Sequence, residues 1–69
     1  MSIRFEEINL KYPDGTIKEV DEKFMHNEFK IATLKKIAFD NNISLTDTKQ
    51  LKTNIIKRLM EYSDLQINL

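Results

Sequence analysis

The first third of the chain shows short apolar–polar alternation, which is the pattern of β-strands. Between residues 3 and 12 apolar side chains recur at every second position, but their parity changes after Phe5. One strand face could hold both sets only if a β-bulge near Glu6-Glu7 restored the register. A Pro-Asp-Gly turn at residues 13–15 and a second alternating run follow. Segment 1–20 therefore predicts a β-hairpin, with strands between about residues 3 and 20.

The second half of the chain has helical spacing. Apolar residues three or four positions apart predict two amphipathic helices, over about 30–41 and about 49–62. Asn42 is expected to end the first helix, because asparagine tolerates the left-handed backbone conformation found at helix ends. Between the helices, Ile43 and Leu45 alternate with hydroxyl residues and are expected to point inward. The side-chain oxygens of residues 46–48 are expected to cap the second helix.

Two segments fit more than one structure. In residues 21–33 we expect a turn or a short helix around 21–25. Asn27 or Thr33 could then cap the next helix, which would begin between residues 28 and 34. The tail at 63–69 alternates in polarity and fits either an edge strand or a frayed end.

These patterns predict an α+β fold, in which an N-terminal β-hairpin packs on a two-helix, helix–extended loop–helix unit. The 69 residues are expected to form a single small domain. We divide it into a hairpin (1–20), a connector (21–33), a helix–extended loop–helix unit (34–62) and a tail (63–69). The predicted core consists of apolar residues at inward positions: Phe5, Ile8, Leu34, Ile37, Ala38, Ile43, Leu45, Ile55, Ile56 and Leu59.

Composition argues against catalysis and cofactors. The chain has no cysteine, one histidine and one glycine. Thiolate metal sites, disulfides and glycine-rich phosphate loops are therefore excluded, and His26 alone does not build a zinc site. A domain of this size is also expected to offer little room for the pocket of about 300 Å3 that a small molecule usually needs. We expect no enzyme activity, no metal, no cofactor and no small-molecule substrate.

The apolar segments also bear on location. No apolar run approaches the roughly 20 residues that a bilayer crossing requires. The N-terminal segment lacks the basic region and apolar core of a secretory signal. We expect no membrane association and a cytoplasmic location, which would be the host cytoplasm if the protein is phage-encoded.

Several positions in residues 34–62 occur in a recognisable order. A Leu-Lys pair and an Ile-Ala pair precede Asn-Ile, a hydroxyl-rich loop, a lysine and a helix with paired isoleucines. The matching residues are Leu34, Lys35, Ile37, Ala38, Asn42, Ile43, Leu45, Lys49, Ile55, Ile56 and Leu59. This order resembles the helix–extended loop–helix superfamily, which includes the SAP motif, the LEM domain and the N-terminal domain of transcription terminator Rho. The chain departs from that pattern in a longer loop–helix junction and in Asp47, which replaces the usual loop glycine.

The resemblance implies binding without catalysis. SAP-type members bind DNA through the loop and the start of the second helix, Rho-type members belong to a nucleic-acid-binding factor, and LEM-type members bind proteins. Small domains of this type are frequent in bacteriophage and prophage genomes, so the resemblance also suggests such an origin.

Charge is distributed unevenly along a chain whose net charge is zero. Residues 30–58 contain seven basic and two acidic side chains. Such a segment attracts phosphate backbones, although lysines on helices also serve as ordinary solvated faces. Hydroxyl groups and helix N-termini suit phosphate oxygens as well. The first hypothesis is therefore a DNA or RNA backbone site formed by Lys35, Lys36, Thr46, Thr48, Lys49 and Lys52.

The second hypothesis is a protein–protein interaction factor of phage or prophage type. It would dock on a host or virion protein through the acidic hairpin and the connector. The edges of the hairpin could accept an added strand. The zero net charge favours this partner class, whereas the lysine-rich half favours nucleic acid. Its expected exposed anchors are Tyr12, Phe24, Met25 and Phe29.

Overall fold

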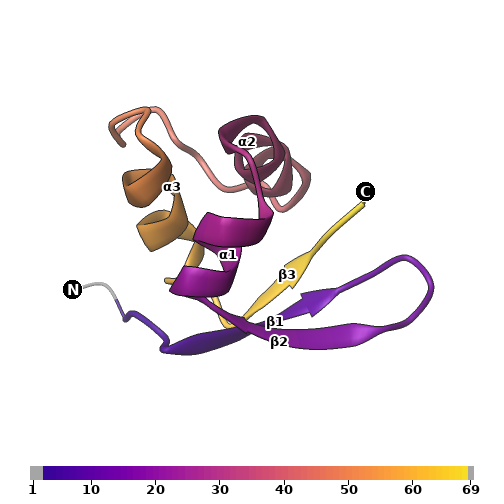
Figure 1. Cartoon of the computed structure of the whole chain (residues 1–69). Helices are drawn as coiled ribbons and strands as arrows, with labels where there is room; N and C mark the ends of the chain where they lie inside the picture. Colours follow the sequence, from indigo (N-terminus) through magenta and orange to yellow (C-terminus); the bar gives the residue numbers. More distant parts are fainter. Residues whose placement is uncertain (1–2, 69) are drawn as a thin grey trace.

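The computed structural model describes residues 3–68, which form a three-stranded sheet with three helices on one of its faces (Figure 1). The predicted α+β class is confirmed. In chain order the elements are β1 (Glu7–Lys11), β2 (Ile17–Asp21), α1 (Glu22–Glu28), α2 (Ile31–Asp40), α3 (Lys52–Leu59) and β3 (Asp64–Gln66).

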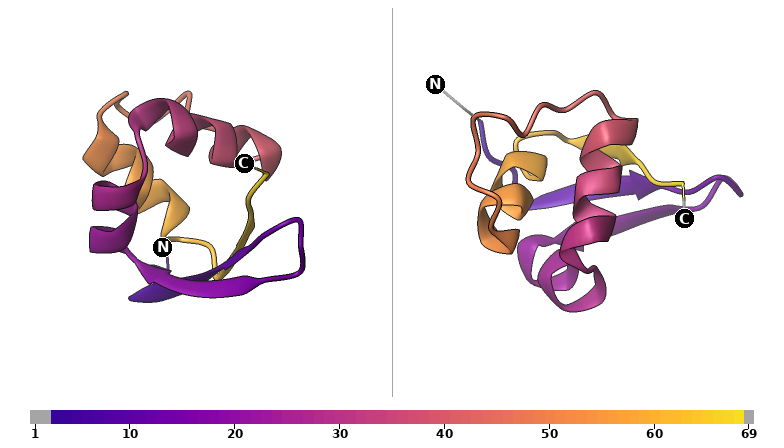
Figure 2. Two further views of the ribbon diagram at one scale, coloured as in Figure 1. Left: turned by 45° about the vertical axis from the view of Figure 1, so that its right-hand side comes forward. Right: turned by 90° about the horizontal axis from the view of Figure 1, so that it is seen from above.

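The sheet has the order β2-β1-β3, with β1 in its centre. β2 pairs antiparallel to β1, and β3 runs parallel to β1 on the other side. The hairpin turn closes through a hydrogen bond from the Tyr12 N–H to the Thr16 carbonyl at 2.8 Å. Gly15 has φ of +92°, a conformation that side chains rarely allow, which explains the glycine at this position. The two views in Figure 2 show all three helices on one side of the sheet and the hairpin tip extending past them.

The first strand is shorter than predicted, and it needs no bulge. β1 begins at Glu7, after the change of parity, so only the second set of apolar residues belongs to the strand. Phe5 instead donates its main-chain N–H to the Met60 carbonyl at 2.8 Å, which ties its segment to the end of α3. Its side chain is 36% exposed and Ile3 is 71% exposed. The assignment of Phe5 to the core was wrong, because the segment leaves the sheet before its side chain could share the inner face.

The connector forms a short helix, one of the two structures expected for it, but the caps differ from the prediction. Asp21 ends β2 and caps α1, since its carboxylate accepts a hydrogen bond from the Phe24 N–H at 2.7 Å. Neither Asn27 nor Thr33 caps α2, which begins at Ile31 after Lys30. The backbone is extended at residues 29 and 30, which separates the two helices.

The end of α2 confirms the predicted role of Asn42. Asn42 has φ of 58°, in the left-handed region. Its N–H donates to the Phe39 carbonyl at 3.1 Å, and the Ile43 N–H donates to the Ala38 carbonyl at 2.8 Å. These two bonds form a Schellman motif, which satisfies carbonyls that the helix leaves free and turns Ile43 into the core.

The second long helix is shorter than predicted at both ends. α3 begins at Lys52, with Leu51 in the N-cap position and no side-chain cap. The expectation that residues 46–48 cap it was wrong, because the helix begins only at Lys52, and Asp47 instead pairs with Arg58. Leu45 is only partly buried against the core.

The core lies between the sheet and the helices. Eight of the ten predicted core residues are buried, and Leu45 and Phe5 are the exceptions described above. The tail forms the edge strand β3, although Leu69 lies outside the described residues. The buried residues absent from the predicted core are Leu10, Val20, Met25, Phe29, Met60, Leu65 and Ile67.

Candidate nucleic-acid interface

A hollow lies between the extended loop and the outward face of α3. Its volume is about 360 Å3 and it is open to solvent. Its α3 residues are spaced three and four apart, so they form one helical face. The lining residues are Asp47, Thr48, Lys49, Asn54, Lys57, Arg58 and Glu61.

Arg58 is held in place in this hollow by two carboxylates. Its Nη2 lies 2.9 Å from Oδ1 of Asp47, and its Nε lies 3.8 Å from Oε2 of Glu61. The hydrogen bond from Arg58 lowers the pKa of Asp47, and the same pair raises the pKa of Arg58. The Asp47 carboxylate therefore occupies a position on Arg58 that a phosphate oxygen could also occupy.

Two further cations in the hollow have no ion-pair partner in the part of the chain that the structure describes. Lys49 and Lys57 are exposed and form no ion pair among residues 3–68. They can therefore bind an anion without first breaking an ion pair within the protein.

The start of α3 adds unbonded N–H donors close to the hollow. The Ile55 N–H makes the first helical bond, to the Leu51 carbonyl at 3.0 Å. In residues 3–68, no acceptor meets the N–H groups of residues 52–54. Free N–H groups and the helix dipole together favour an anion at this end.

The structure separates the predicted nucleic-acid residues into different surfaces. Thr48 and Lys49 line the hollow, whereas Thr46 bonds within the loop, to Ser44 Oγ at 2.9 Å. Lys52 turns toward α1, since its Nζ donates to the His26 carbonyl at 2.6 Å.

The two α2 lysines lie apart from this hollow. Lys36 pairs with Asp40 at 2.8 Å and also donates to the Asn68 carbonyl, near β3. Lys35 is exposed on α2. The prediction missed Asn54, Lys57 and Arg58, although their spacing on one face of a helix was visible in the sequence.

Two of the four predicted protein-binding anchors are not exposed. Met25 is completely buried and Phe29 is 8% exposed, so the expectation that they lie on the surface was wrong. They face the core because α1 packs on both β2 and α3. Tyr12 and Phe24 are partly buried. The Phe24 ring meets the Phe29 ring edge to face at 6.0 Å between centroids.

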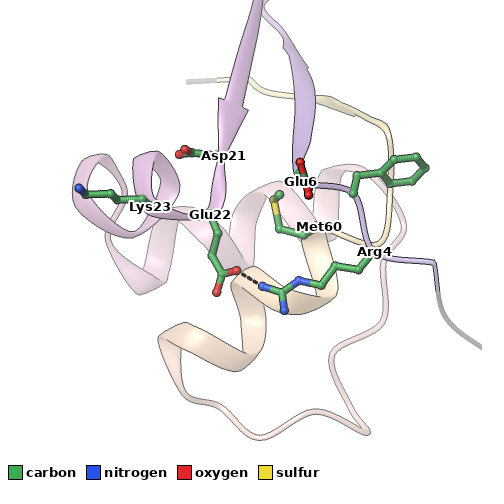
Figure 3. Close-up of a pocket in the computed structure, with 7 residues that line it drawn as sticks. Arg4, Glu6, Asp21, Glu22, Lys23 and Met60 are labelled. Atoms are coloured by element: carbon green, nitrogen blue, oxygen red, sulfur yellow. Dashed lines mark ion pairs between the residues drawn. The ribbon is translucent and has the colours of Figure 1, made fainter.

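A second hollow, of about 430 Å3, lies between the N-terminal segment and the start of α1 (Figure 3). Arg4 and Glu22 form an ion pair across it. Glu6 and Asp21 add two more carboxylates, so its acidic side chains outnumber its basic ones and disfavour phosphate.

A third hollow of about 500 Å3 lies between α1 and α3, beside His26 and Thr53. The three hollows are surface depressions open to solvent rather than enclosed cavities, so the expectation of little room for a small-molecule pocket stays a prediction. The expectation of no small-molecule substrate stays a prediction.

None of the helices within residues 3–68 has both the length and the apolar character needed to cross a membrane. In the same residues, no three histidine, cysteine or acidic side chains are grouped as metal ligands would be.

Comparison with known proteins gave no significant match to a family model, to a curated protein or to a solved structure. The likeness to the helix–extended loop–helix superfamily therefore stays a prediction from the residues of 34–62.

Proposed function

We propose that this protein is a small non-enzymatic binding module that contacts a nucleic-acid backbone through the loop–α3 hollow. The observation that carries the proposal is the hollow itself, in which Lys49 and Lys57, unpaired among residues 3–68, lie beside the uncapped start of α3. Cationic side chains and free N–H groups are the donors that phosphate oxygens use most. The resemblance to SAP-type domains supports the same surface.

The mode of contact follows from the chemistry of the lining. One phosphate accepts hydrogen bonds from the α3 N–H groups and the Thr48 hydroxyl, and the neighbouring phosphates meet Lys49 and Lys57. A phosphate that displaces Asp47 from Arg58 gains a two-pronged guanidinium contact. The hollow contains no aromatic side chain on which a base could stack. Binding should therefore depend strongly on salt and weakly on sequence.

The proposal includes a cytoplasmic location, where nucleic acid is accessible. It covers DNA and RNA alike, because both present the same phosphate chemistry. The test below includes both polymers for this reason.

The proposal is tested by fluorescence anisotropy with labelled duplex DNA, single-stranded DNA and single-stranded RNA. Titrations at several salt concentrations from about 50 mM upward give the slope of log affinity against log salt. The test variant K49Q/K57Q removes the two free cations of the hollow. The matched control K11Q/K23Q removes the same charge from exposed positions on β1 and α1.

The wild-type protein and the control should bind alike, and K49Q/K57Q should bind more weakly. On duplex DNA each lost phosphate contact should make the salt slope shallower by about 0.9. Equal weakening by both double variants would show that net charge alone drives binding, and it would reject the hollow as the site. No binding to any of the three polymers at about 50 mM salt, where backbone contacts are strongest, would reject the proposed function.

A further inference from the structure

The two edges of the sheet differ in how their main-chain groups are used. At the β3 edge, Asn41 Oδ1 accepts from the Gln66 N–H and Asn41 Nδ2 donates to the Gln66 carbonyl, each at 2.8 Å. Lys36 donates to the next outer carbonyl, that of Asn68, at 3.2 Å. The end of α2 therefore occupies the groups that an added strand would need at this edge.

β2 forms the other edge, and its outward main-chain groups have no hydrogen-bond partner among residues 3–68. β1 uses the main-chain groups of Asn9 and Lys11 toward the C-terminal segment, so its even-numbered residues face β2. Their antiparallel partners on β2 also have even numbers. The main-chain N–H and C=O groups of Ile17 and Glu19 consequently point away from β1, in the plane of the sheet. Within residues 3–68, no helix or loop makes a hydrogen bond to them.

The free edge is also sterically accessible along the outer half of the hairpin. In Figure 1 and in both views of Figure 2, the helices lie on one face of the sheet and the hairpin tip extends beyond them. α1 begins directly after Asp21, which it uses as its cap. The accessible stretch therefore runs over residues 16–20.

The sheet face that points away from the helices is acidic beside this edge. Glu7 lies opposite Asp21, and Glu19 is the next residue on the same face of β2. The pKa of Glu7 is raised because its protonated carboxyl can donate a hydrogen bond to Glu19 and because the two ionised groups repel each other. Lys11 is on the same face but lies opposite Ile17, so the acidic part of this face is the half around Glu19. Cationic side chains from a partner would relieve this repulsion.

A second copy of the chain does not suit the edge. Two β2 strands related by a two-fold axis pair antiparallel and place identical residues opposite each other near the axis. A register centred on Lys18 or on Glu19 sets two like charges directly opposite each other. Like charges directly opposite each other destabilise a strand pair. A register centred on Ile17 avoids this, but it sets Glu19 against the turn residue Gly15 and therefore pairs only residues 16–18.

We propose that the β2 edge over residues 16–20 is a strand-addition site for an extended, basic segment of another protein. The added strand hydrogen-bonds to the main chain of Ile17 and Glu19. Its Lys or Arg side chains lie on the acidic face, beside Glu19. Its alternate side chains meet the half-buried ring of Phe24, above which Lys18 Nζ lies 4.5 Å from the centroid. In Figure 1 the hairpin lies at the bottom of the molecule and the loop between α2 and α3 lies at the top. The proposed site does not depend on nucleic-acid binding.

The probe is a labelled peptide of alternating lysine and valine, about eight residues long, as a typical strand is. Its counterpart has glutamate in place of every lysine. Fluorescence anisotropy measures affinity, and amide hydrogen exchange followed by NMR locates the binding site. The basic peptide should bind the wild-type protein and should slow exchange at the amides of Ile17 and Glu19, and the acidic peptide should not.

Two substitutions at one position separate the main chain from the side chain. Ile17 is the first residue of an edge strand, where proline is tolerated, and I17P removes its outward N–H. I17A keeps the N–H and removes only the exposed side chain. I17P should bind the basic peptide about fivefold to tenfold more weakly, because one main-chain hydrogen bond is lost and the ring obstructs the edge. I17A should stay close to wild type.

The double variant E7Q/E19Q tests the charge requirement and should weaken binding and flatten its salt dependence. The proposal is overturned if the basic peptide does not bind, if both peptides bind equally, or if the protection from exchange falls on β3 or the loop. Self-association of the wild-type protein with protection of the Ile17 and Glu19 amides would also overturn it, by making a second copy the occupant. The exchange measurement uses the wild-type chain, so it decides the question even if I17P does not fold.

Discussion

At the scale of single residues, side chains at the surface are fixed by partners far away in the sequence. Asn41 is an example, because its amide joins the end of α2 to Gln66 and also bonds to the Ile37 carbonyl. Asp47 is another, because it pairs with Arg58 instead of capping α3. Glu7 is a third and is held close to a like charge, so it provides a test by titration.

Removal of the Glu7–Glu19 repulsion should stabilise the protein near neutral pH. The folded state raises the pKa of Glu7 above its ordinary value of 4.5. The folded state therefore holds this proton more tightly than the unfolded state, and stability declines as the pH rises from 4.5 through the raised value. E7Q should have a higher melting temperature than wild type at pH 7, and the difference should shrink below pH 4.5.

The control for this prediction is the partner residue. E19Q breaks the same pair, so it should raise the melting temperature in the same direction. The double variant E7Q/E19Q should add little to either single change, since one neutral residue already ends the repulsion. Strict additivity of the two single effects, or an unchanged melting temperature in E7Q, would contradict the pairing.

At the scale of elements, each helix is stable because one of its faces is buried. In α3 this face includes Ile55, Ile56 and Leu59, none of which is accessible to solvent. A helix of this length is only marginal by itself in water, so its packing supplies most of its stability. The opposite face carries the cations of the candidate interface. The same helical period therefore places the core residues and the proposed binding residues.

Truncation of Ile56 should lower the free energy of unfolding by about 2–4 kcal/mol, the usual cost of such a cavity in a core. Urea unfolding followed by circular dichroism measures the change. K57A, one residue further on the exposed face, is the control and should stay close to wild type. I56V should lose only about 0.5–1.5 kcal/mol and remains measurable if I56A does not fold. Equal midpoints for I56A and wild type would reject the core assignment.

At the scale of the whole molecule, the N-terminal hairpin and the helices are held together by β3. This strand pairs with β1 and contributes the buried side chains of Leu65 and, just beyond its end, Ile67. A two-stranded hairpin is marginal by itself, so the third strand and the helical cover are both needed. The tail, which the sequence left open between strand and frayed end, is thus part of the core.

A variant that ends at Ser63 should fail to unfold cooperatively, because it loses two core side chains and exposes the inner edge of β1. Thermal unfolding and the dispersion of amide NMR signals test this. L65S/I67S should have the same effect without shortening the chain, whereas Q66A changes only an exposed residue and should unfold cooperatively. A sharp transition in the shortened chain would show that β3 is dispensable.

The sequence by itself determined the elements whose residues interact locally. The hairpin turn, the two amphipathic faces and the Asn42 helix end depend on backbone preferences and on spacings of two to four residues. Eight core residues could be predicted for the same reason, since one face of a short element is enough to identify them.

The tertiary structure decided everything that depends on contacts between distant segments. Phe5 leaves the core because its segment binds Met60, and Met25 and Phe29 enter it because α1 packs against α3. The candidate interface brings Lys49 of the loop beside the cations of α3. The ion pair between Asp47 and Arg58 holds the loop against α3, and no local sequence pattern predicts this pair. The sequence also could not predict which sheet edge is free. The packing of α2 beside β3 brings Asn41 to the β3 edge, whereas β2 at the other edge has no such partner among the described residues.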